Sequence, residues 1–244
     1  MKPLAIVAFA FPAAFAASAG AQSAPPSSPT PESAELPRPV DRREGNWRLE
    51  VGYRGSFVSD SGYQPFSSNG YFPEFSMAAS HTLLEDGRFS FAGGLAWDVG
   101  SSSSEVRQVD PASLVMQRFT VTLEGRIHFG RWGYAYLRAA PGAAWEKVEV
   151  DDAASPAPLE KTNWLFATDL SAGYACLLWP RDAASKVEPR FWLQGEGGYG
   201  WVAGQELTLE PALPSGSPVQ TTGVDLGALA MQGGFFRVAT AVSF

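Results

Sequence analysis

Apolar and polar residues alternate with a period of two along most of the chain from Asn46 onward. The first run sets Trp47, Leu49, Val51, Tyr53 and Phe57 against Arg48, Glu50, Gly52, Arg54 and Ser56. Because side chains of a strand point alternately to opposite faces, this run predicts a strand with one apolar face. Similar runs predict eight strands in all: 46–57, 71–83, 88–99, 118–129, 132–148, 163–174, 190–201 and 235–244. We therefore expect an all-β, antiparallel protein.

The connections between these strands alternate between long and short. Short turns are expected at 85–87, 130–131 and 180–187, and polar loops at 100–114 and 149–161. The longest connection, 204–230, has room for a short extension of the seventh and eighth strands around Leu207 and Leu226. Pro141 lacks a backbone donor and predicts a β-bulge in the fifth strand. Antiparallel neighbours joined in this way gather all long loops at one end, which is typical of an up-and-down transmembrane β-barrel.

Charge lies almost entirely on one face of the predicted strands, and the other face is nearly free of it. An arginine facing lipid near the bilayer midplane costs about 2–4 kcal/mol, so the charged face must line the lumen. The interior of an eight-stranded barrel is just wide enough for side chains to fill. We therefore expect a salt-bridged polar core, with a narrow solute path past the same residues as the alternative. The predicted lumen-facing residues are Arg48, Glu50, Arg54, Glu74, Asp98, Arg118, Glu124, Arg126, Arg138, Glu146, Asp169, Arg190, Glu196 and Arg237.

The first 45 residues lack this alternation. Residues 1–21 combine a basic start, an apolar run and the small residues Ala19-Gly20-Ala21, which predicts a secretory signal peptide cleaved after Ala21. Residues 22–45 are rich in Pro and Ser and predict a flexible periplasmic segment. The barrel domain is expected over 46–244.

Composition narrows the possible functions. A net charge of −7 without a basic patch argues against a nucleic-acid partner. The single cysteine, Cys176, cannot form an internal disulfide, and no spacing of Cys and His predicts a metal site. His81 and His128 both map to the short-turn ends and lie in no recognisable catalytic motif. We expect no catalytic residue, no cofactor and no metal.

The chain resembles the small eight-stranded outer-membrane β-barrel proteins of Gram-negative bacteria. The last strand matches the signal that the barrel-assembly machinery reads in that family, with Arg237, Val242 and Phe244 in place and Ala239 where glycine is usual. The resemblance implies an outer-membrane location, contact with lipid and lipopolysaccharide, assistance from the assembly machinery during insertion, and a monomer. The first hypothesis is a non-enzymatic, plugged, porin-like barrel with an envelope structural or interaction role. The alternatives are a narrow channel for small or apolar solutes and a lipid-modifying enzyme.

Overall fold

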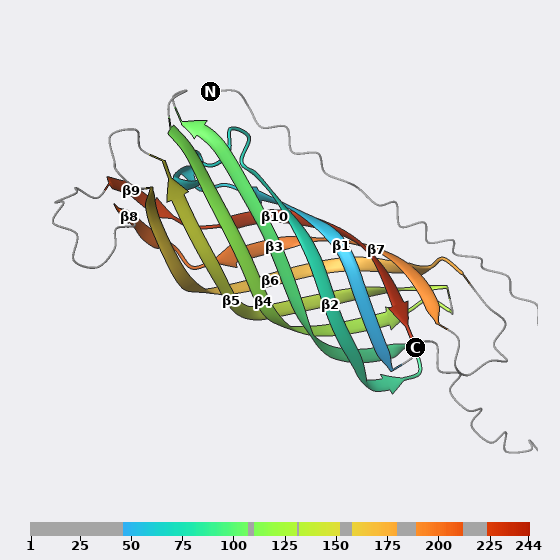
Figure 1. Cartoon of the computed structure of the whole chain (residues 1–244). Helices are drawn as coiled ribbons and strands as arrows, with labels where there is room; N and C mark the ends of the chain where they lie inside the picture. The colour runs from blue at the N-terminus through green and yellow to red at the C-terminus, as the bar shows by residue number, and fades with distance from the viewer. Residues whose placement is uncertain (1–45, 107–109, 131, 152–157, 180–188, 212–223) are drawn as a thin grey trace, which may run out of the picture. The chain divides into compact units, whose positions relative to one another are not determined.

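The computed structural model of the protein describes residues 46–106, 110–130, 132–151, 158–179, 189–211 and 224–244. The predicted signal peptide, the 22–45 segment and the turn at 180–187 lie outside the described residues. Within the described part there are ten strands and one 3-10 helix, η1 (Ser61–Tyr63) (Figure 1). The strands are β1 (Trp47–Val58), β2 (Tyr71–Asp86), β3 (Phe89–Val106), β4 (Asp110–His128), β5 (Gly133–Val150), β6 (Leu159–Leu177), β7 (Arg190–Val202), β8 (Gln205–Pro211), β9 (Val224–Leu229) and β10 (Gln232–Ser243).

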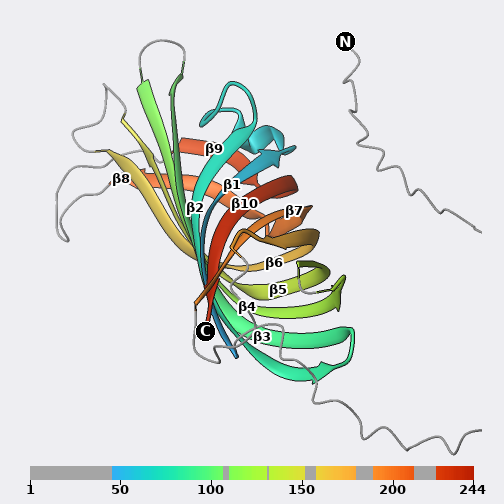
Figure 2. The same cartoon turned by 90° about the vertical axis from the view of Figure 1, so that its right-hand side faces the viewer.

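Eight of these strands close into a barrel. Each strand from β1 to β6 pairs antiparallel with the next in the chain, and β10 pairs with both β7 and β1. Figure 2 shows β10 lying between β1 and β7, where the ring closes. Because every barrel strand has a partner on both sides, the barrel has no free edge. The prediction of an antiparallel barrel of eight strands is confirmed.

The strands extend further at the long-loop end than the sequence predicts. The expected loop at 100–114 is mostly paired strand, with Ser101 opposite Val115 and Ser104 opposite Ala112. The expected loop at 149–161 is shortened in the same way, because β5 runs to Val150 and β6 begins at Leu159. The sequence did not predict these extensions because their outward residues are polar. A strand segment beyond the bilayer does not need an apolar outer face.

The expected bulge at Pro141 is wrong. Thr120 pairs with Gly142 and Leu123 pairs with Ala139, so equal numbers of residues match on β4 and β5 across the proline. The two residue pairs between these positions are absent from the β4–β5 ladder. Pro141, which has no N–H to donate, is thus accommodated without a change of register. The register shifts instead between β2 and β3, at Thr82 and Leu84.

The long connection 204–230 contains the extension predicted around Leu207 and Leu226. Strands β8 and β9 pair with each other as a hairpin. Leu159 and Glu160 of β6 pair with the end of β8. Figure 1 shows this hairpin at the end of the barrel away from the C-terminus.

The outside of the barrel is apolar and the inside is polar. Leu95, Leu137 and Leu170 are 66%, 67% and 66% exposed, and most of the other large exposed side chains on the barrel strands are also apolar or aromatic. A protein in water rarely exposes an apolar surface of this extent. Closed barrels with this polarity span membranes because all backbone groups are paired inside the protein. The fold is therefore that of an outer-membrane β-barrel, as predicted. None of the helices that the structure describes is long and apolar enough to cross a bilayer.

Candidate functional site

The interior of the barrel holds nearly all of the charged residues predicted to line it. Thirteen of the fourteen are buried, at most 7% exposed. Strand alternation places them there: on β4, for example, every even-numbered residue from 112 to 128 is buried. The exception is Arg190, the first residue of β7, which is only half-buried at the short-turn end of the barrel.

Six of these side chains form an ion-pair group nearer the long loops, here called the long-loop group. Its members are Arg54, Arg118, Arg237, Glu74, Asp98 and Asp169. Arg118 is central, because its Nη2 lies 2.6 Å from Oε1 of Glu74 and 3.4 Å from Oδ2 of Asp98, and its Nη1 lies 3.3 Å from Oδ1 of Asp169. Arg54 also pairs with Asp169, donating from both terminal nitrogens. The three cations are matched by three carboxylates.

A second group lies nearer the short turns, here called the short-turn group. Its members are Arg48, Arg126, Arg138, Glu50, Glu124 and Glu196. Nη2 of Arg138 lies 3.1 Å from Glu50 and 2.7 Å from Glu124, and its Nη1 lies 3.3 Å from Glu196. Tyr136 donates a 2.8 Å hydrogen bond to Glu196. This group also contains three cations and three carboxylates.

Several of these pairs cross the lumen. Arg138 on β5 reaches Glu50 on β1, and Arg237 on β10 reaches Asp98 on β3 at 3.3 Å. β5 is not a neighbour of β1 in the barrel, and β10 is not a neighbour of β3, so each of these pairs forms across the lumen. Arg237 joins the two groups, since its Nη1 lies 2.8 Å from Glu196. The twelve charges therefore fill the lumen as one connected, electrically balanced network.

Aromatic rings pack against Arg48 of the short-turn group. The guanidinium carbon of Arg48 lies 5.3 Å from the centre of the Tyr134 ring and 5.9 Å from that of Trp192. Trp192 is buried and donates from Nε1 to Ser243 Oγ at 3.0 Å. A tryptophan suits this inward position, because an indole can stack on a buried arginine and still satisfy its N–H.

The two histidines lie on opposite sides of the barrel wall. His128 is buried, and its Nε2 lies 2.7 Å from Ser90 Oγ. His81 is half-buried and packs edge-on against the exposed Trp47 ring at 4.8 Å. They cannot share a site. The Ser90–His128 pair lies on the inner face of the barrel, where the centre of the His128 ring is 5.2 Å from that of the Tyr134 ring.

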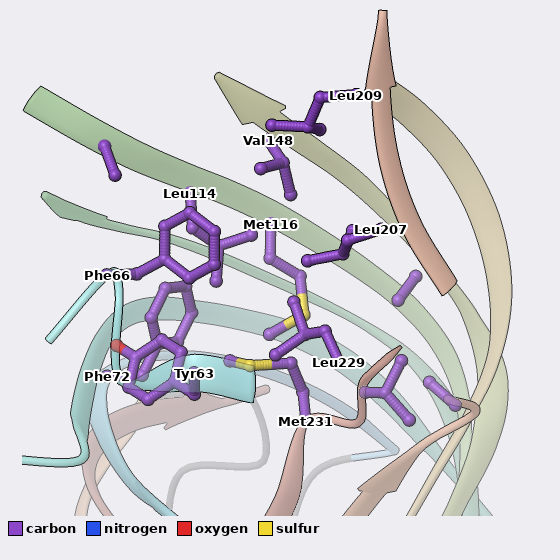
Figure 3. Close-up of a cluster of buried hydrophobic side chains, with 14 of the residues drawn as sticks. Tyr63, Phe66, Phe72, Leu114, Met116, Val148, Leu207, Leu209, Leu229 and Met231 are labelled. Carbon is purple, nitrogen blue, oxygen red and sulfur yellow. The ribbon is translucent and has the colours of Figure 1, made fainter. Parts of the chain in front are cut away.

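An apolar cluster covers the lumen at the long-loop end, and we call it the apolar cap. It consists of Tyr63, Phe66, Phe72, Ala112, Leu114, Met116, Ala144, Val148, Leu159, Ala167, Val202, Leu207, Leu209, Leu229 and Met231. Figure 3 shows the rings of Tyr63, Phe66 and Phe72 on one side of Met116 and the side chains of Leu207 and Leu229 on the other. The inner face of the strand extensions is thus apolar, whereas the inner face of the barrel nearer the short turns is charged.

Sequence reasoning missed the cap because it assigned most of these residues to loops. A signal was present: the inward positions Ala112, Leu114 and Met116 are apolar and continue directly into the charged inward positions that begin at Arg118. Such a change along one face indicates that the strand leaves one environment and enters another.

Glu146 was predicted to belong with the lumen charges, but the structure separates it from both groups. It is 1% exposed and accepts a 2.9 Å hydrogen bond from Nε2 of Gln205 on β8. Within the described residues it has no ion pair. On the outer face of β5, Trp145 is the last aromatic residue and Lys147 is the first charged one. Glu146 therefore lies where the apolar outer surface of this strand ends. Burial raises the pKa of Glu146 to about 7, and the hydrogen bond from Gln205 opposes part of this rise.

Other site chemistry is sparse in the part of the chain that the structure describes. No group of His, Cys, Asp and Glu there could hold a metal ion. Cys176 is half-buried, with its Sγ 3.5 Å from the carbonyl of Leu193.

Neither a family model nor a curated protein matches the chain. Its structure is similar to solved outer-membrane proteins at low identity. One is Ail, the attachment invasion locus protein of Yersinia pestis, in complex with the heparin analogue sucrose octasulfate (13% identity, 82% of this chain and 99% of that chain, TM-score 0.48). Others are Neisserial surface protein A (10%, 82% and 97%, 0.47) and the outer membrane protease OmpT from Escherichia coli (8%, 82% and 97%, 0.44).

Proposed function

We propose that this protein is a sealed, non-enzymatic outer-membrane barrel that serves the envelope through its external end. The observation that carries the proposal is the ion-pair network that crosses the lumen. A solute would have to separate Arg138 from Glu50 and Arg237 from Asp98, and breaking a buried pair costs about 3–5 kcal/mol. The apolar cap closes the same path a second time. What remains for function is the surface of the strand extensions and their connections.

The remaining expectations form part of this proposal. The chain is exported by its signal peptide, cleaved after Ala21, and inserted as a monomer by the barrel-assembly machinery, which reads Arg237, Val242 and Phe244. Residues 22–45 remain in the periplasm. The barrel exterior contacts outer-membrane lipid and lipopolysaccharide.

Conductance of the refolded mature protein in planar bilayers tests the seal. We expect no steady conductance in the native protein, with a general porin as positive control and resistance of the folded barrel to detergent as proof of folding. The double variant Glu124→Ala/Arg126→Ala removes one charge of each sign from the short-turn group. It should also be silent, because Arg138 still bridges Glu50 and Glu196 and the long-loop group is untouched.

Steady conductance in the native protein would refute the seal and favour the narrow channel. Conductance in the double variant alone would mean that the short-turn group is the only barrier and that the cap does not close the path. Turnover of phospholipid or lipid A by the native protein, lost in His128→Ala, would instead support the lipid-modifying enzyme.

A further inference from the structure

The β8–β9 hairpin covers the barrel mouth with few backbone attachments. Leu207, Leu209 and Leu229 are at most 1% exposed, because they pack onto the inner face of the strand extensions. Within the described residues, the backbone of the hairpin pairs with the barrel wall only at Leu159 and Glu160. Apart from this pairing and the two-residue links to β7 and β10, side-chain contacts hold the hairpin over the mouth of the barrel.

In addition to the apolar packing, three side chains of the barrel wall form hydrogen bonds with the hairpin. Lys161 Nζ donates to the carbonyl of Glu206 at 2.5 Å. Asn163 donates to Oε1 of Gln205, and Gln205 in turn donates to Glu146. Gln205 is thus the link between the hairpin and a buried carboxyl at the base of the cap.

Among the described residues, no cation forms an ion pair with Glu146, and the charged groups around it have other partners. On β4 the nearest charged residue along the inner face is Arg118, which is engaged by the three carboxylates of the long-loop group. On β6, Lys161 is held by the hairpin backbone. On β8 the charged neighbour is the exposed acid Glu206. On β5 itself Lys147 faces outward and pairs with the acids Glu149 and Glu160.

The charge balance of the lumen leads to the same conclusion. The two ion-pair groups contain six arginines and six carboxylates, all of them buried. Glu146 is a seventh buried carboxyl, with the cap on one side and its hydrogen bond to Gln205 on the other. When Glu146 is neutral, the described buried charges are balanced. When it is ionised, no ion pair among the described residues stabilises its charge.

We propose that Glu146 is a proton-operated latch for the β8–β9 hairpin. The neutral carboxyl lets the hairpin stay packed over the mouth of the barrel. The ionised carboxylate favours a state in which the hairpin lifts and water reaches the carboxylate. This inference concerns the external end of the barrel only, so the lumen network stays in place in both states.

The direction and size of the effect follow from the raised pKa. An ordinary glutamate titrates near 4.5, and burial moves the pKa of Glu146 to about 7. If lifting the hairpin restores the ordinary value, the proportion of lifted hairpin rises by about tenfold between pH 6 and pH 8.5, since one pKa unit is a factor of ten in the equilibrium.

Hydrogen–deuterium exchange of the refolded mature protein in lipid nanodiscs tests the latch. The readout is the protection of amides in β8 and β9, corrected for the intrinsic pH dependence of exchange, at pH 6 and pH 8.5. We expect native hairpin protection to fall by about tenfold at the higher pH, while that of β1 and β10 stays constant. In Glu146→Gln, which keeps an acceptor for Gln205 but cannot ionise, hairpin protection should not change with pH.

Glu206→Gln is the matched control, because it removes an exposed acid from the hairpin itself and should keep the native pH response. A carboxyl ¹³C NMR titration of Glu146 in the native chain gives a second readout that needs no variant. Native hairpin protection that is independent of pH would overturn the latch, as would a Glu146 titration near 4.5. An unchanged pH response in Glu146→Gln would also overturn it. None of these outcomes bears on conductance, so the latch and the sealed lumen can fail separately.

Discussion

Asp169→Asn should be among the most destabilising isosteric changes in the barrel. Asp169 accepts hydrogen bonds from both Arg54 and Arg118 in the long-loop group. An asparagine keeps the shape of the side chain but removes the charge. It leaves the three arginines of this group with two of its three carboxylates, Glu74 and Asp98, in the buried interior of the barrel.

The size of the effect can be worked from the geometry. Nη1 of Arg118 lies 3.3 Å from Oδ1 of Asp169, and at an effective dielectric constant of ~20 two unit charges at about this distance attract by about 5 kcal/mol. Removing one partner of a buried pair costs about 3–5 kcal/mol in measured cases. We therefore expect Asp169→Asn to lower the free energy of unfolding by about 3–5 kcal/mol, a large part of the ~5–15 kcal/mol typical of a folded domain.

The measurement is equilibrium unfolding in urea from lipid vesicles, followed by tryptophan fluorescence. Glu160→Gln is the control, because Glu160 pairs with Lys147 at 3.1 Å while both side chains are at least a third exposed. This exposed pair should contribute only about 0–1 kcal/mol. The double variant Arg54→Gln/Asp169→Asn restores the balance of charges and should recover part of the loss. A cost below about 1 kcal/mol for Asp169→Asn, equal to that of the control, would show that the network does not act as a desolvated ion-pair core.

Three further outcomes are expected in the same unfolding assay. Gly200→Ala should cost about 1–3 kcal/mol, because its Cβ would lie 2.6 Å from a nitrogen of the long-loop group, whereas Gly195→Ala, with nothing within 4 Å, should cost less than 1 kcal/mol. Tyr136→Phe removes a donor to a buried carboxylate and should cost about 1.5–3 kcal/mol, while Tyr134→Phe, whose hydroxyl has no partner among the described residues, should be close to neutral. The stability that a neutral Glu146 provides is complete below the unfolded pKa near 4.5 and is lost as the pH rises through about 7; between pH 6 and 9 the native protein should lose about 1.4 kcal/mol relative to Glu146→Gln. Equal costs within either matched pair, or equal pH profiles for native and Glu146→Gln, would contradict the respective argument.

The sequence by itself determined the barrel. Alternation such as that from Trp47 to Phe57 is a local property, because neighbouring side chains of a strand must face opposite sides whatever the rest of the chain does. The confinement of charge to one face then decided which side meets lipid. The alternation of short and long connections decided that the strands close as an up-and-down barrel.

Only the tertiary structure decided which charges meet. Arg237 and Asp98 are 139 residues apart in the chain, and their contact depends on strand tilt and register, which a period of two does not encode. The same holds for Glu146: its inward position was predictable, but its separation from the arginines of both ion-pair groups depends on how far along β5 it lies from them. The apolar cap was hidden for a related reason, because polar outer faces made the strand extensions resemble loops. What an inward residue such as Leu114 contacts is set by the hairpin that folds over the barrel from about 90 residues later.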